Sequence, residues 1–319
     1  MGEVIDMTPN HIKVAIFAFN RPQHLSNCLN SIAKNPNIES FSFVIFVDGP
    51  RNEKEKEKVE RTIEVAKSYD NILKLEIVTN EKNLGLSRSL IGGINKILEE
   101  TDKIIVIEDD LIVSKNFLDY MRKGLEKYEL DQNVASIHGF TYDFLEETDA
   151  SYFLRGADCW GWGTWKNRWD SVEWSSEKLA KELKEKKLES SFDLDGAYPY
   201  MKLLERQISG AVDSWAIRWH ASMFIKNKLT LFPSRSLVEN SGFDGSGTHT
   251  NQTNNVRKYE IDDIKIRKYP EEVAESFLIR RKFKKFLRRK FHTHMRFTPV
   301  WLYCGLRRRL NQQMRKIGK

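Results

Sequence analysis

The sequence of 319 residues has 40% hydrophobic and 30% charged residues, which is ordinary for a globular protein. Its net charge of +7 is unevenly spread, because residues 278–319 contain no Asp or Glu and hold fifteen of the 52 Lys and Arg residues. The rest of the chain therefore has 37 basic against 45 acidic residues, a net charge of −8. An acidic body argues against a broad nucleic-acid-binding surface, and we expect no nucleic-acid partner.

The cysteine pattern and the hydropathy exclude several further classes of protein. Cys28, Cys159 and Cys304 lie far apart and form no Cys/His pattern, so we expect neither a disulfide framework nor a zinc site. Residues 1–13 lack the basic region followed by an apolar region that is typical of a signal peptide. No apolar run reaches the ~18 residues of a membrane-spanning helix. We expect a cytoplasmic protein.

Short apolar runs alternate with amphipathic stretches over the first 140 residues. The runs suit strands that are buried on both faces, and the stretches carry apolar residues at helical spacing. Strands are expected at 14–19, 41–47, 73–78 and 103–107, and helices from residue 22, at 53–69 and at 86–99. This alternation predicts an α/β fold whose mainly parallel sheet is flanked by helices.

The second half of the chain is less regular. Strands are expected at 134–140, 152–154 and 229–232, and helices at 176–190 and 215–226. Trp162, Trp165 and Trp169 have i, i+3, i+7 spacing, which predicts the core-facing stripe of a helix. Residues 240–255 are rich in Gly, Ser, Thr and Asn and form a loop long enough to be functional.

Polar residues follow three of the predicted strands, at Asn20-Arg21, at Asp48-Gly49 and at Glu108-Asp109-Asp110. In parallel α/β sheets, ligands bind beyond the carboxyl ends of the strands. The three adjacent carboxylates repel one another unless a cation binds them, and Mg²⁺ and Mn²⁺ prefer oxygen ligands. The sequence therefore predicts a metal site at 108–110, with a solvated acidic loop as the alternative.

The acidic cluster and its surroundings resemble a known enzyme family. Residues 104–113 resemble the DXD region of GT-A glycosyltransferases, in the Glu-Asp-Asp form of bacterial family two type enzymes and of the N-acetylglucosaminyltransferase that initiates complex N-glycans. Four more segments match in the same order, at 18–22, 47–49, 80–88 and 160–163. The resemblance implies a GT-A (Rossmann-like) fold, a nucleotide-sugar donor, and Mn²⁺ or Mg²⁺ as the cofactor.

The matched positions near the first strands imply a nucleotide site. Asp48 would accept a hydrogen bond from the N–H of a uracil ring, although an Asp before Gly is also a common turn former. Arg21 and Arg88 would lie near the nucleotide and its phosphates, or else they are surface arginines. The expected nucleotide-binding residues are Phe19, Asn20, Arg21, Asp48, Asn83 and Arg88.

The later matched positions imply the metal and sugar end of the site. Asp110 would hold the metal, Asp109 would approach the ribose or the metal shell, and Glu108 would bind hydroxyls of the transferred sugar. Aromatic rings pack against sugar rings, so Trp160 or Trp162 is expected beside the sugar. His249 is a second candidate metal ligand, because many GT-A enzymes use a His in this part of the chain; otherwise it is a solvated loop residue.

An inverting transferase needs a base that takes the proton of the attacking acceptor hydroxyl. Residues 212–215 resemble the Asp-containing loop of the eukaryotic relative, which implies Asp213 as this base. Asp158 and Asp244 are the alternatives. If Asp213 is instead structural, it caps the helix that follows.

The basic segment predicts a separate function at the end of the chain. We expect a glycosyltransferase domain at 1–277, with a nucleotide half at about 1–140 and an acceptor half at about 141–277, followed by a tail at 278–319. Basic amphipathic helices with aromatic residues lie in the interface of anionic membranes. The tail is therefore expected to bind the inner face of the cell membrane through residues 280–319, with RNA binding as the alternative.

Together these features predict an inverting enzyme that moves a sugar from a UDP-sugar, with a UDP-N-acetylhexosamine as one candidate, to a lipid-linked glycan in bacterial surface polysaccharide synthesis. One rival is a sugar-1-phosphate nucleotidyltransferase, which shares the sheet topology and the acidic metal site. That rival should have a Gly-rich basic loop after the first strand, where this chain has Asn20-Arg21-Pro22. The other rival is a non-catalytic scaffold of the same fold on a membrane or RNA.

Overall fold

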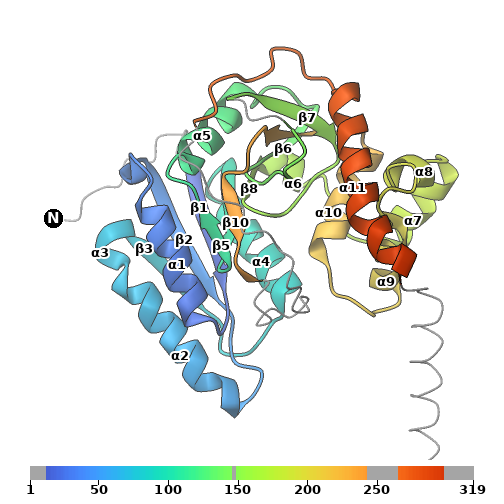
Figure 1. Ribbon diagram of the computed structural model, residues 1–319. Helices are drawn as coiled ribbons and strands as arrows, with labels where there is room; N and C mark the ends of the chain where they lie inside the picture. Colours follow the sequence, from blue (N-terminus) through green and yellow to red (C-terminus); the bar gives the residue numbers. More distant parts are fainter. Residues whose placement is uncertain (1–11, 146–148, 243–264, 298–319) are drawn as a thin grey trace, which may run out of the picture.

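The computed structural model describes residues 12–145, 149–242 and 265–297, with side chains to residue 290. Its centre is an eight-stranded sheet in the order β3-β2-β1-β4-β8-β6-β9-β7 (Figure 1). The strands are β1 (Ile12–Ala18), β2 (Phe41–Val47), β3 (Leu75–Thr79), β4 (Lys103–Glu108), β6 (Val134–His138), β7 (Ser151–Arg155), β8 (Trp162–Trp165) and β9 (Leu229–Pro233). A smaller antiparallel pair joins β5 (Leu111–Val113) to β10 (Val238–Asn240).

The first four strands of this order are parallel, as the strand–helix alternation predicts. The third strand begins two residues later than expected, because residues 70–73 form the short helix α3 (Asp70–Leu73). Lys74 then adopts a left-handed conformation (φ 49°), which ends that helix and turns the chain into β3.

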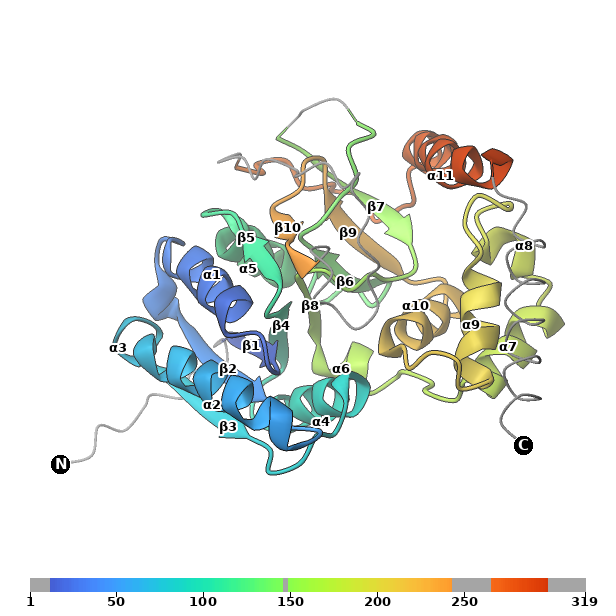
Figure 2. The ribbon, with the colours of Figure 1, turned by 60° about the horizontal axis from the view of Figure 1, so that its bottom comes forward.

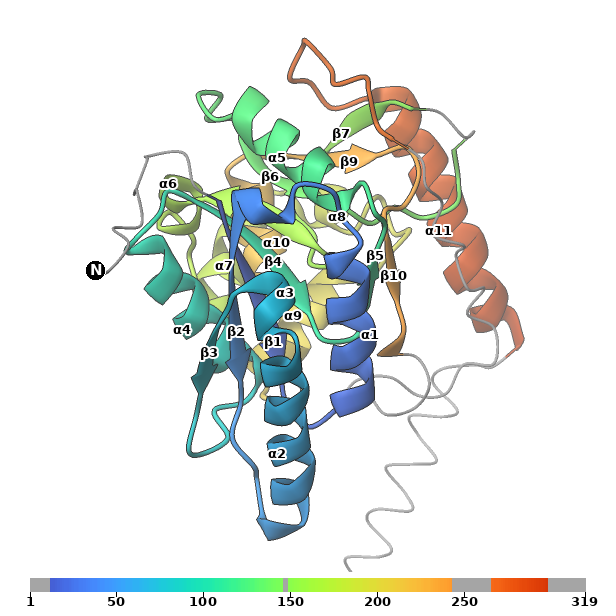
Figure 3. The ribbon, with the colours of Figure 1, turned by 90° about the vertical axis from the view of Figure 1, so that its left-hand side faces the viewer.

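Helices cover both faces of the parallel half (Figure 3). On one face, α1 (Pro22–Ala33) and α2 (Glu53–Ser68) bury a core that includes Val14 and Ile16, and α5 (Phe117–Lys127) extends this core over β6 and β8. On the other, α4 (Leu86–Leu98) packs on a second core with Ala15 and Phe17. Successive side chains of a strand point to opposite faces, so a continuous apolar strand is needed to supply both cores.

The second half of the sheet mixes strand directions, with β8 antiparallel to both β4 and β6. A lobe of helices lies beside it (Figure 2). It is made of α7 (Ser176–Glu185), α8 (Glu189–Phe192), α9 (Tyr200–Ile208) and α10 (Trp215–Ile225), which share a core of their own. The helix expected at 176–190 is thus two helices, which part at Lys187 where φ is +55°.

The prediction that Trp162, Trp165 and Trp169 form one stripe of a helix is wrong. Trp162 and Trp165 lie on strand β8, and only Trp169 is helical, in α6 (Lys166–Trp169). An odd spacing along a strand sends two side chains to opposite faces, so Trp162 packs in the core beside α4 and Trp165 in the core beside α5. The ring of Trp162 stacks against Trp215 at 5.5 Å between centroids.

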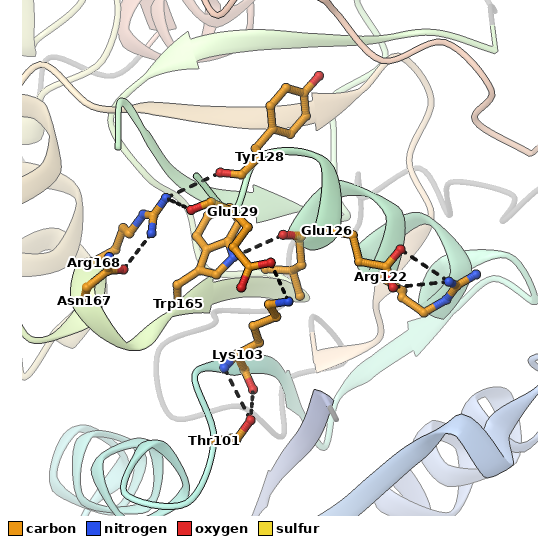
Figure 4. A network of polar contacts seen from close by, with 10 residues as sticks. Thr101, Lys103, Arg122, Glu126, Tyr128, Glu129, Trp165, Asn167 and Arg168 are labelled. Atoms are coloured by element: carbon orange, nitrogen blue, oxygen red, sulfur yellow. Dashed lines mark hydrogen bonds and ion pairs between the residues drawn. The ribbon is translucent and has the colours of Figure 1, made fainter. Parts of the chain in front are cut away.

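A polar network holds the C-terminal end of α5 against this segment (Figure 4). The guanidinium of Arg168 donates to the backbone carbonyls of Glu129 (2.6 Å) and Asp131 (3.1 Å), just beyond that helix. It also stacks over the ring of Trp165, whose indole N–H donates to the carbonyl of Leu125. Arg168 thus holds the turn that follows α5 against the Trp-rich segment. The Trp-rich segment is therefore largely structural.

The basic segment begins as a helix that packs on the domain, α11 (Phe277–Phe297). Phe283 and Phe286 contact Tyr142 and Phe144, and Leu287 is 1% exposed. The expected boundary after residue 277 stays a prediction, and the packing of Phe283, Phe286 and Leu287 shows that the described start of the basic segment contacts the domain. None of the helices within the described residues is long and apolar enough to span a bilayer.

Candidate active site

The strand registers bring the three polar strand ends to one edge of the sheet. Ala18, the last residue of β1, pairs with Val47 of β2, and Phe17 pairs with Glu108 of β4. The backbone N–H of Asp48 donates to the carbonyl of Ala18, and that of Asp109 donates to Phe17, both at 2.9 Å. Residues 19–21 therefore lie between Asp48 on one side and the acidic cluster on the other.

A cavity of about 780 Å³ opens at this edge, a volume typical of ligand sites. It brings together eight of the residues expected from the sequence, which are Phe19, Asn20, Arg21, Asp48, Asn83, Glu108, Asp109 and Asp213. These side chains come from both halves of the chain, since Asp213 immediately precedes the cap of α10. Eight of the predicted site residues thus line one cavity, whereas Asp110, the expected metal ligand, is not among the lining residues.

Arg21 supplies the positive charge that the acidic cluster needs. Its guanidinium forms an ion pair with Asp109, which is 2% exposed, and a second one with Asp110 at 3.0 Å between Nη1 and Oδ2. Both carboxylate oxygens of Asp109 accept from Arg21. The repulsion within 108–110 is therefore relieved in part by the protein itself, and a metal ion is not the only cation that can balance it.

Burial and mutual repulsion change the acidity of the cluster. Burial raises the pKa of Glu108 to about 8, and the carboxylates of Asp110 and Asp109 add to the rise. Burial also raises the pKa of Asp109 to about 6, although the neighbouring Arg21 opposes it. Burial favours the protonated form of both carboxyl groups, and the repulsion between the carboxylates is relieved by a bound proton or cation.

Asp48 organises the loop between β3 and α4. Its carboxylate accepts hydrogen bonds from the backbone N–H groups of Leu84 (2.9 Å) and Gly85 (3.0 Å) and from the side chain of Asn80 (3.2 Å). Asn83 donates to the carbonyl of Gly49 at 2.9 Å. These contacts give Asp48 a structural role that resembles the turn-forming alternative, while its contact with a uracil ring stays a prediction.

The wall formed by α1 and α2 contains residues that the sequence interpretation missed. The guanidinium of Arg51 lies over the ring of Phe19, 5.1 Å from its centroid, and Asn20 donates to Glu55 at 3.2 Å. The cavity is also lined by His24, Lys58 and Arg61. Glu55, Lys58 and Arg61 follow one another three residues apart on α2, so a helical-face analysis of this charged segment would have grouped them, whereas Arg51 precedes the helix.

Asp213 also lines the cavity and contacts Arg218, which is not among the lining residues. Asp213 is 62% exposed and lies 3.7 Å from the guanidinium of Arg218. Arg218 also donates to the backbone carbonyl of Ser214 at 3.2 Å and to the hydroxyl of Ser87 on α4. The cap of α10 is Ser214, whose side chain accepts from Ile217, so the capping alternative for Asp213 is wrong.

Several expected residues lie elsewhere. Arg88 is exposed on α4 and does not line the cavity, in keeping with the surface alternative. Trp162 is fully buried among other tryptophans, so its expected contact with a sugar is wrong. Trp160 is half-buried against Phe140, at 4.6 Å between ring centroids, and also lies outside the cavity lining. His249 and Asp244 lie outside the described residues.

Asp158, the other alternative base, belongs to a different part of the surface. It accepts a hydrogen bond from the backbone N–H of Cys159 at 2.8 Å and lines a small aromatic cavity of about 40 Å³ beneath α11. That volume accommodates little more than water. Of the two candidates within the described residues, only Asp213 lines the large cavity.

The residues present fit a divalent cation of the kind that uses few protein ligands. Within the described part of the chain, no three His, Cys, Asp or Glu side chains are grouped as a metal site. Mg²⁺ and Mn²⁺ are commonly held by one or two carboxylates together with substrate phosphates, so a full protein cage is not required. Asp110 has one carboxylate oxygen paired with Arg21 and lies next to Ser241, which donates to its carbonyl at 2.8 Å.

Comparison with known proteins places this fold and site in a family. The family model for glycosyl transferase family 2 matches residues 13–207, more than half of the chain. No curated protein matches the sequence. Among solved structures, TarS of S. aureus in complex with UDP-GlcNAc has a TM-score of 0.34 and 17% identity, over 43% of this chain and 38% of TarS. The mannosyltransferase PcManGT from Pyrobaculum calidifontis, in complex with GDP-Man and Mn²⁺, has a TM-score of 0.32 and 14% identity, over 41% and 35% of the two chains.

The chain therefore spans less than half of each of these solved proteins. The family match favours glycosyl transfer over the nucleotidyltransferase rival, and it does not test the rival of a non-catalytic scaffold with the same fold. It also confirms the GT-A expectation, together with the mainly parallel sheet and its flanking helices. The matched residues include the three strand ends and the loop that Asp48 holds, and the chain is accordingly a member of glycosyl transferase family 2.

Proposed function

We propose that this protein is an inverting glycosyltransferase that takes a sugar from a UDP-sugar, with a UDP-N-acetylhexosamine as a candidate donor, and attaches it to a glycan. The observation that carries the proposal is the cavity itself. It combines Glu108 and the buried Asp109 at the end of β4 with an exposed carboxylate, Asp213, in one lining. A donor lying between them leaves its sugar open to an acceptor on the Asp213 side.

The donor diphosphate would lie over the acidic cluster. Asp110 would hold Mn²⁺ or Mg²⁺ there, and the bound metal would supply Lewis-acid stabilisation of the departing diphosphate. Arg21, already paired with Asp109 and Asp110, orients both carboxylates and brings a second positive charge toward the phosphates. Phe19 and Arg51 form a stacked surface beside Asp48 that suits a planar base.

Asp213 would act as the base in this reaction. Its carboxylate is solvent-exposed within the cavity wall, where it can accept the proton of an acceptor hydroxyl as that oxygen attacks the sugar. Arg218 contacts it from within α10 and ties that helix to α4. Arg218 is thus a positioning residue for the base.

The acceptor that we propose is a lipid-linked glycan made for a bacterial surface polysaccharide, used by an enzyme resting on the inner face of the cell membrane. This part of the proposal is supported by the concentration of positive charge at 280–319, which suits an anionic bilayer.

Titration of the protein with UDP in the presence and absence of Mn²⁺ tests the donor site. We expect Mn²⁺ to strengthen UDP binding to the natural protein and to have no such effect in Asp110→Ala. Asp170→Ala, which removes an exposed carboxylate outside the cavity, is the matched control and should keep the metal effect. Metal-enhanced UDP binding that survives in Asp110→Ala would contradict the assignment of Asp110.

A further inference from the structure

Over residues 277–290, whose side chains are described, one side of helix α11 packs on the domain and the other is exposed. Toward the domain, Arg280 pairs with Glu275 at 3.0 Å, Lys284 pairs with Asp195, and Phe283, Phe286 and Leu287 pack on the body. These contacts fix the rotation of α11 about its own axis. The opposite side of the helix must therefore face away from the domain, and α11 lies along the outside of the molecule (Figures 2 and 3).

The outward side combines exposed apolar residues with cations. Phe277 is 78% exposed and Leu278 is 60% exposed. With about 100° between successive residues of a helix, the outward residues fall within an arc of about 140°. They are Phe277, Leu278, Arg281, Lys282, Lys285 and Arg289, all exposed. Arg288, at the edge of this arc, is excluded because its guanidinium donates to the backbone carbonyl of Asp195 in the domain at 2.8 Å. None of them is acidic, and no Asp or Glu follows in the sequence.

We propose that this outward side of α11 is the surface through which the protein binds an anionic lipid bilayer. The proposal refines the membrane association suggested above and does not depend on the transferase reaction. It differs from the sequence expectation in the residues that meet the lipid. Phe286 is excluded by its packing on Tyr142, and Phe277 and Leu278 take its place.

The chemistry of the outward side distinguishes a bilayer from a nucleic acid. Cations attract any phosphate carrier, so charge alone does not select between the two. Two adjacent, exposed, large apolar side chains at the end of the basic row have no partner on the backbone of an RNA duplex. In a bilayer they enter the boundary between headgroups and acyl chains while the cations contact the headgroups. Because the domain fixes α11, lipid binding also fixes the orientation of the whole domain.

Binding of the full chain to vesicles tests the proposal. We compare vesicles of phosphatidylglycerol and phosphatidylethanolamine with vesicles of phosphatidylcholine, and expect binding only to the first. The variant Arg281→Gln/Lys282→Gln/Lys285→Gln/Arg289→Gln should bind the anionic vesicles about a hundredfold more weakly or worse, because each cation at the surface contributes about a fivefold factor. The control Lys178→Gln/Lys181→Gln/Lys184→Gln/Lys186→Gln removes the same charge from exposed positions on α7 and at its C-cap, and it should bind almost as the natural protein does.

A second pair of variants tests the apolar contribution. Phe277→Ala/Leu278→Ala should lose the binding that persists at high salt, where ionic attraction is screened. The control Ile72→Ala/Leu130→Ala removes two equally exposed apolar residues elsewhere and should retain it. All four variants should still transfer sugar to a water-soluble acceptor, so a failed transferase assay and a failed vesicle assay are separate results. Equal loss in both charge variants would overturn the proposal, as would natural protein that shifts an RNA duplex but ignores anionic vesicles.

Discussion

At the scale of single residues, Asp213 carries the clearest chemical prediction. Asp213→Asn keeps the size of the side chain and its position beside Arg218 but removes the basic oxygen. General base catalysis contributes about 10²–10⁴-fold, so we expect turnover to fall by at least about a hundredfold. The affinity for UDP should change little, because the base acts on the acceptor.

Asp158→Asn is the matched comparison, since Asp158 lies at the separate small cavity. Steady-state kinetics with a water-soluble acceptor, together with UDP titration, distinguish the two variants. If Asp158→Asn loses turnover and Asp213→Asn does not, the base is Asp158 and the proposed acceptor side of the cavity is wrong.

His138 gives a prediction about pH and stability. The ring is fully buried; Nδ1 donates to the carbonyl of Phe140 at 2.9 Å, and Nε2 accepts from the backbone N–H of Trp160 at 3.0 Å. These contacts require a neutral ring, and burial lowers the pKa of His138 below its ordinary value of 6.5. Below pH 6.5 the unfolded chain therefore binds a proton at this ring that the folded protein does not bind. The contribution of His138 to stability is thus constant above that pH and falls as the pH decreases below it.

The slope that His138 contributes is at most about 1.4 kcal/mol per pH unit. Urea unfolding of the natural protein and of His138→Gln, each measured at about pH 7.5 and about pH 5.5, isolates it as the difference between their pH dependences. His220, whose pKa burial also lowers, and the acidic cluster are present in both proteins and cancel. Identical pH dependences would show that His138 does not titrate in this range.

At the scale of elements, we expect the replacement of Gly49 and of Gly92 by alanine to have opposite effects on stability. A Cβ on Gly49 would lie 2.5 Å from the backbone carbon of Lys82 and 2.7 Å from the carbonyl oxygen of Asn80, so the loop held by Asp48 would have to move. Gly49→Ala should cost about 1–3 kcal/mol and weaken UDP binding.

A Cβ on Gly92, within α4, meets no atom within 4 Å. Gly92→Ala should therefore stabilise the protein by about 0.5–1 kcal/mol through the lower entropy of the unfolded chain, with UDP affinity unchanged. Urea unfolding and UDP titration of both variants check the pair. Changes of the same sign would show that the loop does not pack on Gly49 in this way.

At the scale of the whole molecule, α11 belongs to the folded domain. Phe283→Ala/Phe286→Ala should cost about 2–4 kcal/mol, because it opens the contact with Tyr142 and Phe144. Arg281→Ala/Lys282→Ala, on the outward side, should stay within about 0.5 kcal/mol. A chain ending at residue 277 should be less stable than either variant. Equal stability of that short chain and the full protein, in urea unfolding, would support a boundary at 277.

The parallel half of the sheet and the positions of its polar strand ends were determined by the sequence alone. Each strand there is a continuous apolar run between amphipathic helices, and this local pattern has few alternatives when both faces of the sheet are covered. The placement of Asp48 and Glu108–Asp110 at one edge then follows from parallel pairing, since carboxyl ends of parallel strands meet.

Contacts between distant residues were decided only by the tertiary structure. The spacing of Trp162 and Trp165 fits a helix or a strand equally, and pairing of β8 with β4 and β6 made it a strand. Arg21 lies 88 residues from Asp109 in the sequence, so no local pattern predicts that Arg21 forms an ion pair with the acidic cluster. The amphipathic pattern of α11 likewise predicts an apolar side but does not predict what covers it. Packing against Tyr142 and insertion into lipid remove the same apolar surface from water, so both satisfy the pattern.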